Sequence, residues 1–177
     1  MDKRKDSDTN QAKNSTTVER KSARELAVTR TFNGPADVVF NAWTKPELLK
    51  RWWIPKSCDF SFLSCETDVR TGGTYRFVFS NPSGGQPMAF FGRYVEVTPP
   101  TRLVWTNDEG EEPGAVTTVT FEEKAGETLV VIQDLYPSKQ ALDDAIASGS
   151  TSGWGEQFEQ LEQLLVALER SVRARPA

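Results

Sequence analysis

The sequence of 177 residues contains no histidine and only two cysteines. Without histidine, the chain cannot form a Ser-His-Asp or Cys-His nucleophile or a histidine-ligated metal site. Two cysteines are too few for a closed structural zinc site. The sequence also lacks a Walker loop, and Gly149, Gly153 and Gly155 do not follow the G-x-G-x-x-G order of dinucleotide-binding proteins. These absences predict a protein that uses no metal and no nucleotide cofactor.

Long apolar runs are also lacking. A membrane-spanning helix needs about 20 consecutive apolar residues, and a secretory signal needs an apolar run behind its charged start. Neither pattern occurs, so we expect a soluble, cytoplasmic protein with no membrane partner. Cys58 and Cys65 are seven residues apart in one predicted strand, where they cannot pair without an intervening turn. Unpaired thiols are typical of a reducing compartment.

The charge of the chain is unevenly distributed. The formal net charge is −4, yet residues 1–23 carry six Lys/Arg and four Asp/Glu, so the rest of the chain carries −6. An acidic body disfavours binding to nucleic acid, although Lys50, Arg51 and Lys56 lie beside Trp52 and Trp53. Long cationic side chains that cover buried indoles produce the same local pattern. Because residues 1–23 are poor in apolar groups, we predict a disordered tail there and a single domain over residues 24–177.

Hydrophobic periodicity predicts about seven antiparallel strands. The first strand alternates between apolar and polar residues, although Arg30 interrupts its apolar face. Turn-forming residues separate the later strands in the manner of a meander. The predicted strands cover residues 25–33, 57–69, 74–80, 88–97, 102–106, 116–122 and 128–135.

Helical signals occur between the first two strands and at the end of the chain. Pro35 suits a first helical turn, Thr44 and Glu47 have the spacing of a capping box, and Pro55 ends the segment, which predicts two short helices. Ser138 can cap a further short helix. The long terminal helix has an apolar stripe formed by Trp154, Phe158, Leu161, Leu165, Leu168 and Val172. The order of elements predicts an α+β fold in which an antiparallel sheet wraps around the last helix.

Four motifs in the same order resemble the START-like helix-grip superfamily (SRPBCC). They are residues 35–53, residues 68–77, residues 91–96 with 99–103, and Gly153-Trp154. Within this superfamily, the chain resembles the AHSA-like branch, named for the activator of the ninety-kilodalton heat-shock chaperone ATPase. The resemblance extends from about Glu25 to Val172 and implies a cavity between a curved sheet and the terminal helix. Many relatives have a histidine three residues before the Gly-Trp pair, where this chain has Ser150, so no role of that histidine carries over.

The implied cavity suits a small apolar or amphipathic ligand. The candidate ligand-binding residues are Tyr75, Phe77, Phe79, Phe90, Tyr94, Glu96, Trp105, Trp154 and Phe158. Each aromatic residue can equally belong to an ordinary packed core. Glu96 alternates with Phe90, Gly92 and Tyr94, which predicts an inward side chain that serves either in acid-base chemistry or in a structural ion pair. Trp43, Trp52 and Trp53 are interpreted as a lid that contacts the terminal helix.

Three functions remain compatible with the sequence. The first is a binding module that carries, sequesters or senses a small apolar ligand. The second is an enzyme similar to the cyclases and hydratases of the superfamily, with Glu96 or Tyr94 as acid or base. The third, implied by the name of the branch alone, is a co-chaperone or stress-response interaction module with a chaperone partner. The sequence leaves open whether the protein is a monomer or a homodimer.

Overall fold

The computed structural model describes residues 15–110 and 113–174. The predicted disorder of residues 1–14 therefore lies outside the described residues. The eight strands are β1 (Thr17–Arg20), β2 (Glu25–Asn33), β3 (Phe62–Thr67), β4 (Thr74–Phe79), β5 (Met88–Thr98), β6 (Arg102–Thr106), β7 (Val116–Lys124) and β8 (Glu127–Leu135). The four helices of this part of the chain are α2 (Ala36–Thr44), α3 (Pro46–Leu49), α4 (Lys139–Ala147) and α5 (Trp154–Ala174).

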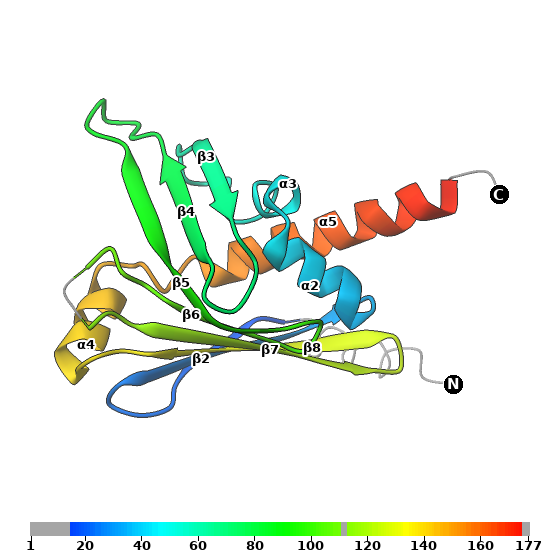
Figure 1. Ribbon diagram of the computed structural model, residues 1–177, viewed down its shortest axis with the longest axis horizontal. Helices are drawn as coiled ribbons and strands as arrows, with labels where there is room; N and C mark the ends of the chain where they lie inside the picture. Colours follow the sequence, from blue (N-terminus) through cyan, green and yellow to red (C-terminus); the bar gives the residue numbers. More distant parts are fainter. Residues whose placement is uncertain (1–14, 111–112, 175–177) are drawn as a thin grey trace, which may run out of the picture.

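All strands belong to one antiparallel sheet with the order β1-β2-β8-β7-β6-β5-β4-β3. The sheet is strongly bent, so that β3, β4 and part of β5 stand up from the remaining strands (Figure 1). Helix α5 runs along the concave side, next to α2 and α3 (Figure 1). This arrangement confirms the predicted α+β helix-grip fold.

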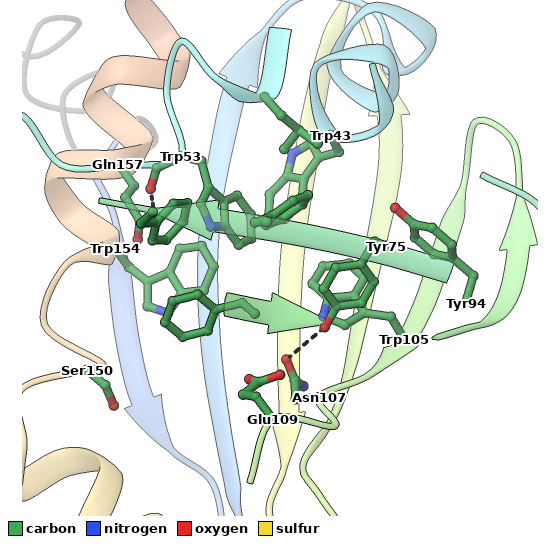
Figure 2. A pocket seen from close by; sticks show the side chains of 14 residues that line it. Trp43, Trp53, Tyr75, Tyr94, Trp105, Asn107, Glu109, Ser150, Trp154 and Gln157 are labelled. Carbon is green, nitrogen blue, oxygen red and sulfur yellow. Dashed lines mark hydrogen bonds between the residues drawn. The ribbon is translucent and has the colours of Figure 1, made fainter. Parts of the chain in front are cut away.

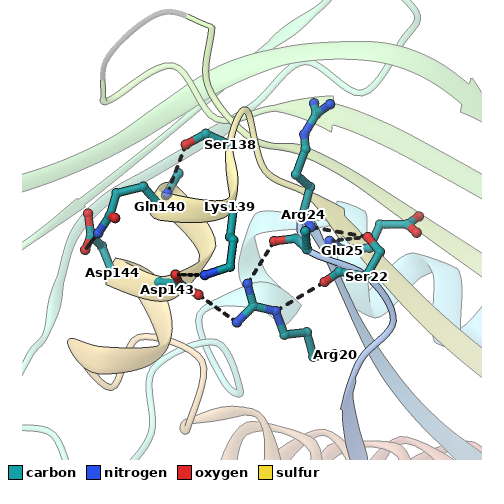
Figure 3. Close-up of polar contacts among 11 residues, drawn as sticks. Arg20, Ser22, Arg24, Glu25, Ser138, Lys139, Gln140, Asp143 and Asp144 are labelled. Atoms are coloured by element: carbon teal, nitrogen blue, oxygen red, sulfur yellow. Dashed lines mark hydrogen bonds and ion pairs between the residues drawn. The ribbon is translucent and has the colours of Figure 1, made fainter.

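Strand β1 is the eighth strand, in a region where the sequence predicted a disordered tail through Ala23. The structure differs from that expectation because β1 pairs along the edge of β2. Its four residues are all exposed, so the strand buries no apolar side chain that the sequence pattern could reveal. The Arg20 guanidinium also binds the carboxylate of Asp143 at 2.7 Å and the carbonyl oxygen of Ala23 at 2.8 Å (Figure 3).

The two short helices form where they were predicted, but the capping box between them is absent. Lys45, not Thr44, is the N-cap of α3, and it makes no side-chain capping bond. The Thr44 hydroxyl instead donates to the carbonyl oxygen of Phe40 at 3.1 Å, inside α2. The predicted cap of α4 is confirmed, since the Ser138 hydroxyl accepts a hydrogen bond from the backbone N–H of Ala141 at 3.0 Å.

The core lies between the sheet, the two short helices and α5. The side chain of Trp52 is fully buried, and its indole N–H donates to the carbonyl oxygen of Ala42 at 2.9 Å. Phe158 of α5 packs edge-on against Phe32 of β2, with ring centroids 5.2 Å apart. Among the described helices, none combines the length and the apolar character that a membrane crossing requires.

Arg30 is the exception on the inward face of β2. Its side chain is only 3% exposed and binds Glu159 of α5 at 2.9 Å. The guanidinium carbon also lies 5.3 Å from the ring centre of Phe32, within the range of a cation–π contact. The residue that interrupts the apolar pattern therefore faces the core and links β2 to α5.

Both cysteines are free and half-buried, in agreement with the predicted unpaired state. Only Cys65 lies in a strand, because β3 begins at Phe62 rather than at Ser57. Burial raises the pKa of the Cys65 thiol to about 11. The thiol of Cys65 is therefore protonated, and poorly reactive, near neutral pH.

Candidate functional site

A pocket of about 200 Å³ lies between the upright strands, the α2–α3 segment and the start of α5 (Figure 2). Nine of its fourteen lining residues are aromatic. The lining residues are Trp43, Leu49, Trp53, Tyr75, Phe77, Phe79, Phe90, Tyr94, Trp105, Asn107, Glu109, Ser150, Trp154 and Gln157. Phe90, Glu109 and Ser150 are exposed, which places them at the opening of the pocket.

Seven of the nine candidate residues from the sequence line this pocket. They are Tyr75, Phe77, Phe79, Phe90, Tyr94, Trp105 and Trp154. The alternation of β4 directs Tyr75, Phe77 and Phe79 to the same side, and all three are buried. Gly92 allows β5 and β6 to approach closely, since an added Cβ would lie 1.9 Å from the carbonyl oxygen of Thr106 and 3.0 Å from the Tyr75 ring.

Glu96 does not line the pocket, and its predicted inward orientation is wrong. The ladder between β5 and β6 shifts register between Tyr94 and Glu96. Beyond this bulge Val97 packs against the core, so the alternation is reversed and Glu96 faces outward. The Glu96 carboxylate is 43% exposed and binds Arg102 at 2.5 Å, which is the structural ion pair considered as the alternative.

Phe158 also lies outside the pocket lining, because it belongs to the core behind it. Its side chain is fully buried and contacts two residues that do line the pocket. The ring centroids are 5.4 Å from Trp154 and 6.2 Å from Trp43. Phe158 therefore supports the wall of the pocket without facing it.

Trp43 and Trp53 line the pocket, whereas the sequence predicted only a lid role for them. Both residues contact Trp154 of the terminal helix. The ring of Trp43 stacks on that of Trp154 with ring centroids 6.4 Å apart, and the ring of Trp53 meets it edge-on with centroids 6.1 Å apart. The adjacent Trp52 is fully buried in the core. Consecutive residues in a turn point in different directions, so their adjacency in the sequence indicated that Trp52 and Trp53 would not face the same environment. Trp52 lies in the core, and Trp53 faces the pocket.

Four polar side chains of the lining were not among the predicted site residues. Asn107 and Glu109 follow β6, Ser150 precedes α5, and Gln157 lies on its first turns. The Ser150 hydroxyl donates to the carbonyl oxygen of Ala145 at 2.9 Å. The side-chain amide of Gln157 donates to the carbonyl oxygen of Trp53. None of the four has a periodic signal in the sequence, because they belong to loops or to the edge of a helix stripe.

A chain of hydrogen bonds continues from the pocket into the sheet. The Tyr75 hydroxyl donates to the carbonyl oxygen of Thr106 at 2.8 Å and lies 3.4 Å from the side-chain oxygen of Asn107 (Figure 2). The Asn107 amide donates to the Thr117 hydroxyl at 3.1 Å, and that hydroxyl donates to the carboxylate of Asp134 at 2.6 Å. The Asn107 side chain therefore contacts both Tyr75 of β4 and Thr117 of β7.

The electrostatics of the pocket are dominated by one carboxyl group. Burial raises the pKa of the Tyr75 and Tyr94 phenols above the usual range, so both stay neutral near pH 7. Glu109 is the one acidic or basic side chain among the described lining residues. Burial raises the pKa of Glu109, and the backbone N–H of Phe91, which donates to its carboxylate at 3.3 Å, partly offsets that effect.

The potential metal ligands in the described part of the chain are dispersed. No group of three or more His, Cys, Asp or Glu residues comes together there in a manner that could hold a metal ion. The chemistry that the pocket offers is therefore that of aromatic surfaces, neutral hydroxyl and amide groups, and the single carboxyl group of Glu109.

Comparison with known proteins identifies solved structures similar to this chain. A Rhodobacter sphaeroides protein has a TM-score of 0.78 at 24% identity, covering 86% of this chain and 99% of that chain. A Staphylococcus epidermidis protein has a TM-score of 0.70 at 29% identity, with coverages of 85% and 94%. An AHSA1-like protein from Aeromonas hydrophila has a TM-score of 0.62 at 21% identity, with coverages of 81% and 94%.

These structural similarities support the fold. A search among curated proteins found no match. The model of the family described as Activator of Hsp90 ATPase homolog 1-like protein matches residues 33–166, which is most of the chain. The chain therefore belongs to the Activator of Hsp90 ATPase homolog 1-like family.

Proposed function

We propose that this protein binds a small apolar or amphipathic molecule in the aromatic pocket. The observation that carries this proposal is the pocket itself, a space of about 200 Å³ bounded by nine aromatic side chains. Protein interiors are normally close-packed and contain few voids larger than a water molecule. Ligand pockets share the composition seen here, a mainly apolar lining with a few polar groups near the opening.

The expected affinity follows from the apolar surface that a ligand would bury. A six-carbon chain gains about 5 kcal/mol from burial at about 0.8 kcal/mol per methylene, before the cost of immobilisation. The pocket should therefore bind simple alkyl ligands weakly and larger natural ligands more tightly.

The test is a titration of the protein with 1-hexanol in which the indole N–H signals of the tryptophans are monitored by NMR. Four of the five tryptophans line the pocket, whereas the N–H of Trp52 is buried against a backbone carbonyl oxygen. Binding in the pocket should shift signals of the four and spare that of Trp52. If no indole signal moves at millimolar hexanol, or if Trp52 moves as much as the others, the proposal fails.

A matched pair of variants locates the binding site. The hydroxyls of Ser148 and Ser150 both donate to the carbonyl oxygen of Ala145, and both residues are exposed, but only Ser150 lines the pocket. Ser150→Trp should obstruct the opening and weaken hexanol binding. Ser148→Trp should leave it unchanged. Equal effects of the two variants would place the binding site elsewhere.

Membership of the family supports a second candidate, an interaction with a chaperone of the Hsp90 class. The support is the family description, which refers to activation of the ATPase of that chaperone. Addition of the purified protein to the chaperone of its host should then raise the ATPase rate. An unchanged rate at saturating protein, together with failure to co-purify, would remove this candidate.

The enzymatic alternative receives less support. Glu96 points away from the pocket, and the raised pKa of Tyr94 disfavours the phenolate that a general base would need. A cytoplasmic location stays part of the proposal, supported by the two free thiols, which suit a reducing compartment.

A further inference from the structure

The pocket contains a negative charge without a positive partner. The Glu109 carboxylate accepts a backbone hydrogen bond from Phe91, and it forms no salt bridge among the residues that the structure describes. Arg93 comes within 3.8 Å of the neighbouring Asp108 instead. Figure 2 shows Glu109 and Asn107 beside one another at one side of the ring cluster.

The remaining walls present aromatic rings to the same space. Trp43 and Trp105 lie with their ring centres 6.2 Å apart, and Trp105 lies 6.4 Å from Tyr75. The face of an indole ring carries partial negative charge and attracts cations, more strongly than the face of tyrosine or phenylalanine does. Rings of this kind next to a carboxylate form a suitable environment for an ammonium group.

Ligands of other charge fit this environment less well. A carboxylate or phosphate ligand would be repelled by Glu109 and would find no Lys or Arg in the described lining. A neutral ligand would further desolvate the Glu109 carboxylate without supplying a partner. A cation compensates the carboxylate and also contacts the ring faces.

From the charge and the rings together, we propose that the pocket selects small amphipathic organic cations, in which an ammonium group meets Glu109 and an apolar chain lies among the aromatic rings. This inference rests on the proposed ligand-binding function and adds the charge of the ligand to it.

The experiment compares three ligands that share one chain and differ in head group: hexyltrimethylammonium, 1-hexanol and hexanoate. Dissociation constants are measured by calorimetry or NMR at pH 8 and low ionic strength. The cation should bind about tenfold more tightly than the alcohol, in keeping with cation–π and ion-pair contributions at a partly desolvated site. Hexanoate should bind more weakly than the alcohol.

Two variants assign the preference to its residue. Glu109→Gln should weaken binding of the cation and so remove most of its preference over 1-hexanol. Glu96→Gln is the matched control, because it removes a carboxylate from the outer side of the same sheet and changes the net charge equally. It should preserve the preference.

The outcomes separate the two proposals. If all three ligands bind equally, if hexanoate binds most tightly, or if Glu109→Gln keeps the preference for the cation, the inferred selectivity is overturned while ligand binding itself stands. If none of the three ligands binds, both proposals fall.

Discussion

Replacing Asp134 by asparagine should remove a pH-dependent loss of stability from strand β8. Asp134 continues the inward row of that strand, formed by Thr128, Val130 and Ile132. Burial raises the pKa of the Asp134 carboxyl to about 6, and the hydrogen bond from Thr117 only partly offsets this effect. The folded protein therefore holds the proton of Asp134 more tightly than the unfolded chain does.

The sign and size of the effect follow from the two pKa values. The carboxyl titrates near 3.8 when unperturbed and near 6 in the folded protein. Between about pH 4 and pH 6 the folded state binds more protons than the unfolded state, so the free energy of unfolding falls as the pH rises. A tenfold difference in proton affinity corresponds to about 1.4 kcal/mol, which makes the total loss about 3 kcal/mol. Above pH 6 the loss is complete and constant.

Asparagine keeps an acceptor for the Thr117 hydroxyl and removes the charge. The variant should therefore be more stable than the parent protein at pH 7.5, by about 1 to 3 kcal/mol after allowance for an amide group that needs its own partner. At pH 4, where Asp134 is largely protonated in the folded parent, this advantage should disappear. Urea unfolding monitored by tryptophan fluorescence measures the free energy of unfolding of the parent protein and of the variant at each pH in this range.

The control is Asp59→Asn, which removes the charge of an exposed carboxylate. This variant should show the same dependence of stability on pH as the parent protein. If Asp134→Asn also follows the parent curve between pH 4 and pH 6, then burial does not shift this carboxyl group, and the reasoning is refuted.

Four further substitutions test the packing of the core, the sheet and α5. Arg30→Ala should lower the free energy of unfolding by about 3 kcal/mol, because it leaves a buried oxygen of Glu162 without a nearby cation. Adding Glu162→Leu should recover most of this loss, as measured by urea titration. Gly92→Ala should cost more than about 2 kcal/mol, since the new Cβ would lie 1.9 Å from a carbonyl oxygen of β6. Gly155→Ala, with no atom within 4 Å of the new Cβ, should be neutral or stabilising by up to about 1 kcal/mol in thermal unfolding. Trp52→Phe should destabilise by about 2 kcal/mol, because it removes a buried indole and its 2.9 Å hydrogen bond; equal stability to urea would contradict this.

The sequence predicted the elements that bury an apolar face, because the periodicity of a sequence records burial. Strands β2 and β4–β8 and helix α5 each show such a face. Strand β1 has none, and it forms through backbone pairing to an exposed edge that becomes available only when β2 is in place. Thr44 shows a second limit, since its spacing to Glu47 fits a capping box while its hydroxyl bonds within the preceding helix.

The aromatic walls of the pocket were predictable for the same reason. Tyr75 and Phe77 share a face through the alternation of β4, and Trp154 begins the apolar stripe of α5. The orientation of Glu96 was not predictable, because the bulge after Tyr94 depends on how β5 pairs with β6. A strand's own sequence does not contain the register of its partner.

The charge of the pocket depends on a segment that follows no periodic rule. The loop after β6 is acidic, and its composition does not reveal that Glu109 lies at the pocket opening. The Glu109 carboxylate accepts a hydrogen bond from the backbone N–H of Phe91 on the neighbouring strand, which holds it at the pocket opening. The strands and α5 therefore determine the shape of the pocket, and a loop residue determines its charge. Under the proposed function, a substitution in this loop should change the preferred charge of the ligand while the sheet, the lid and the cavity stay the same, so proteins with this fold need not bind ligands of one class.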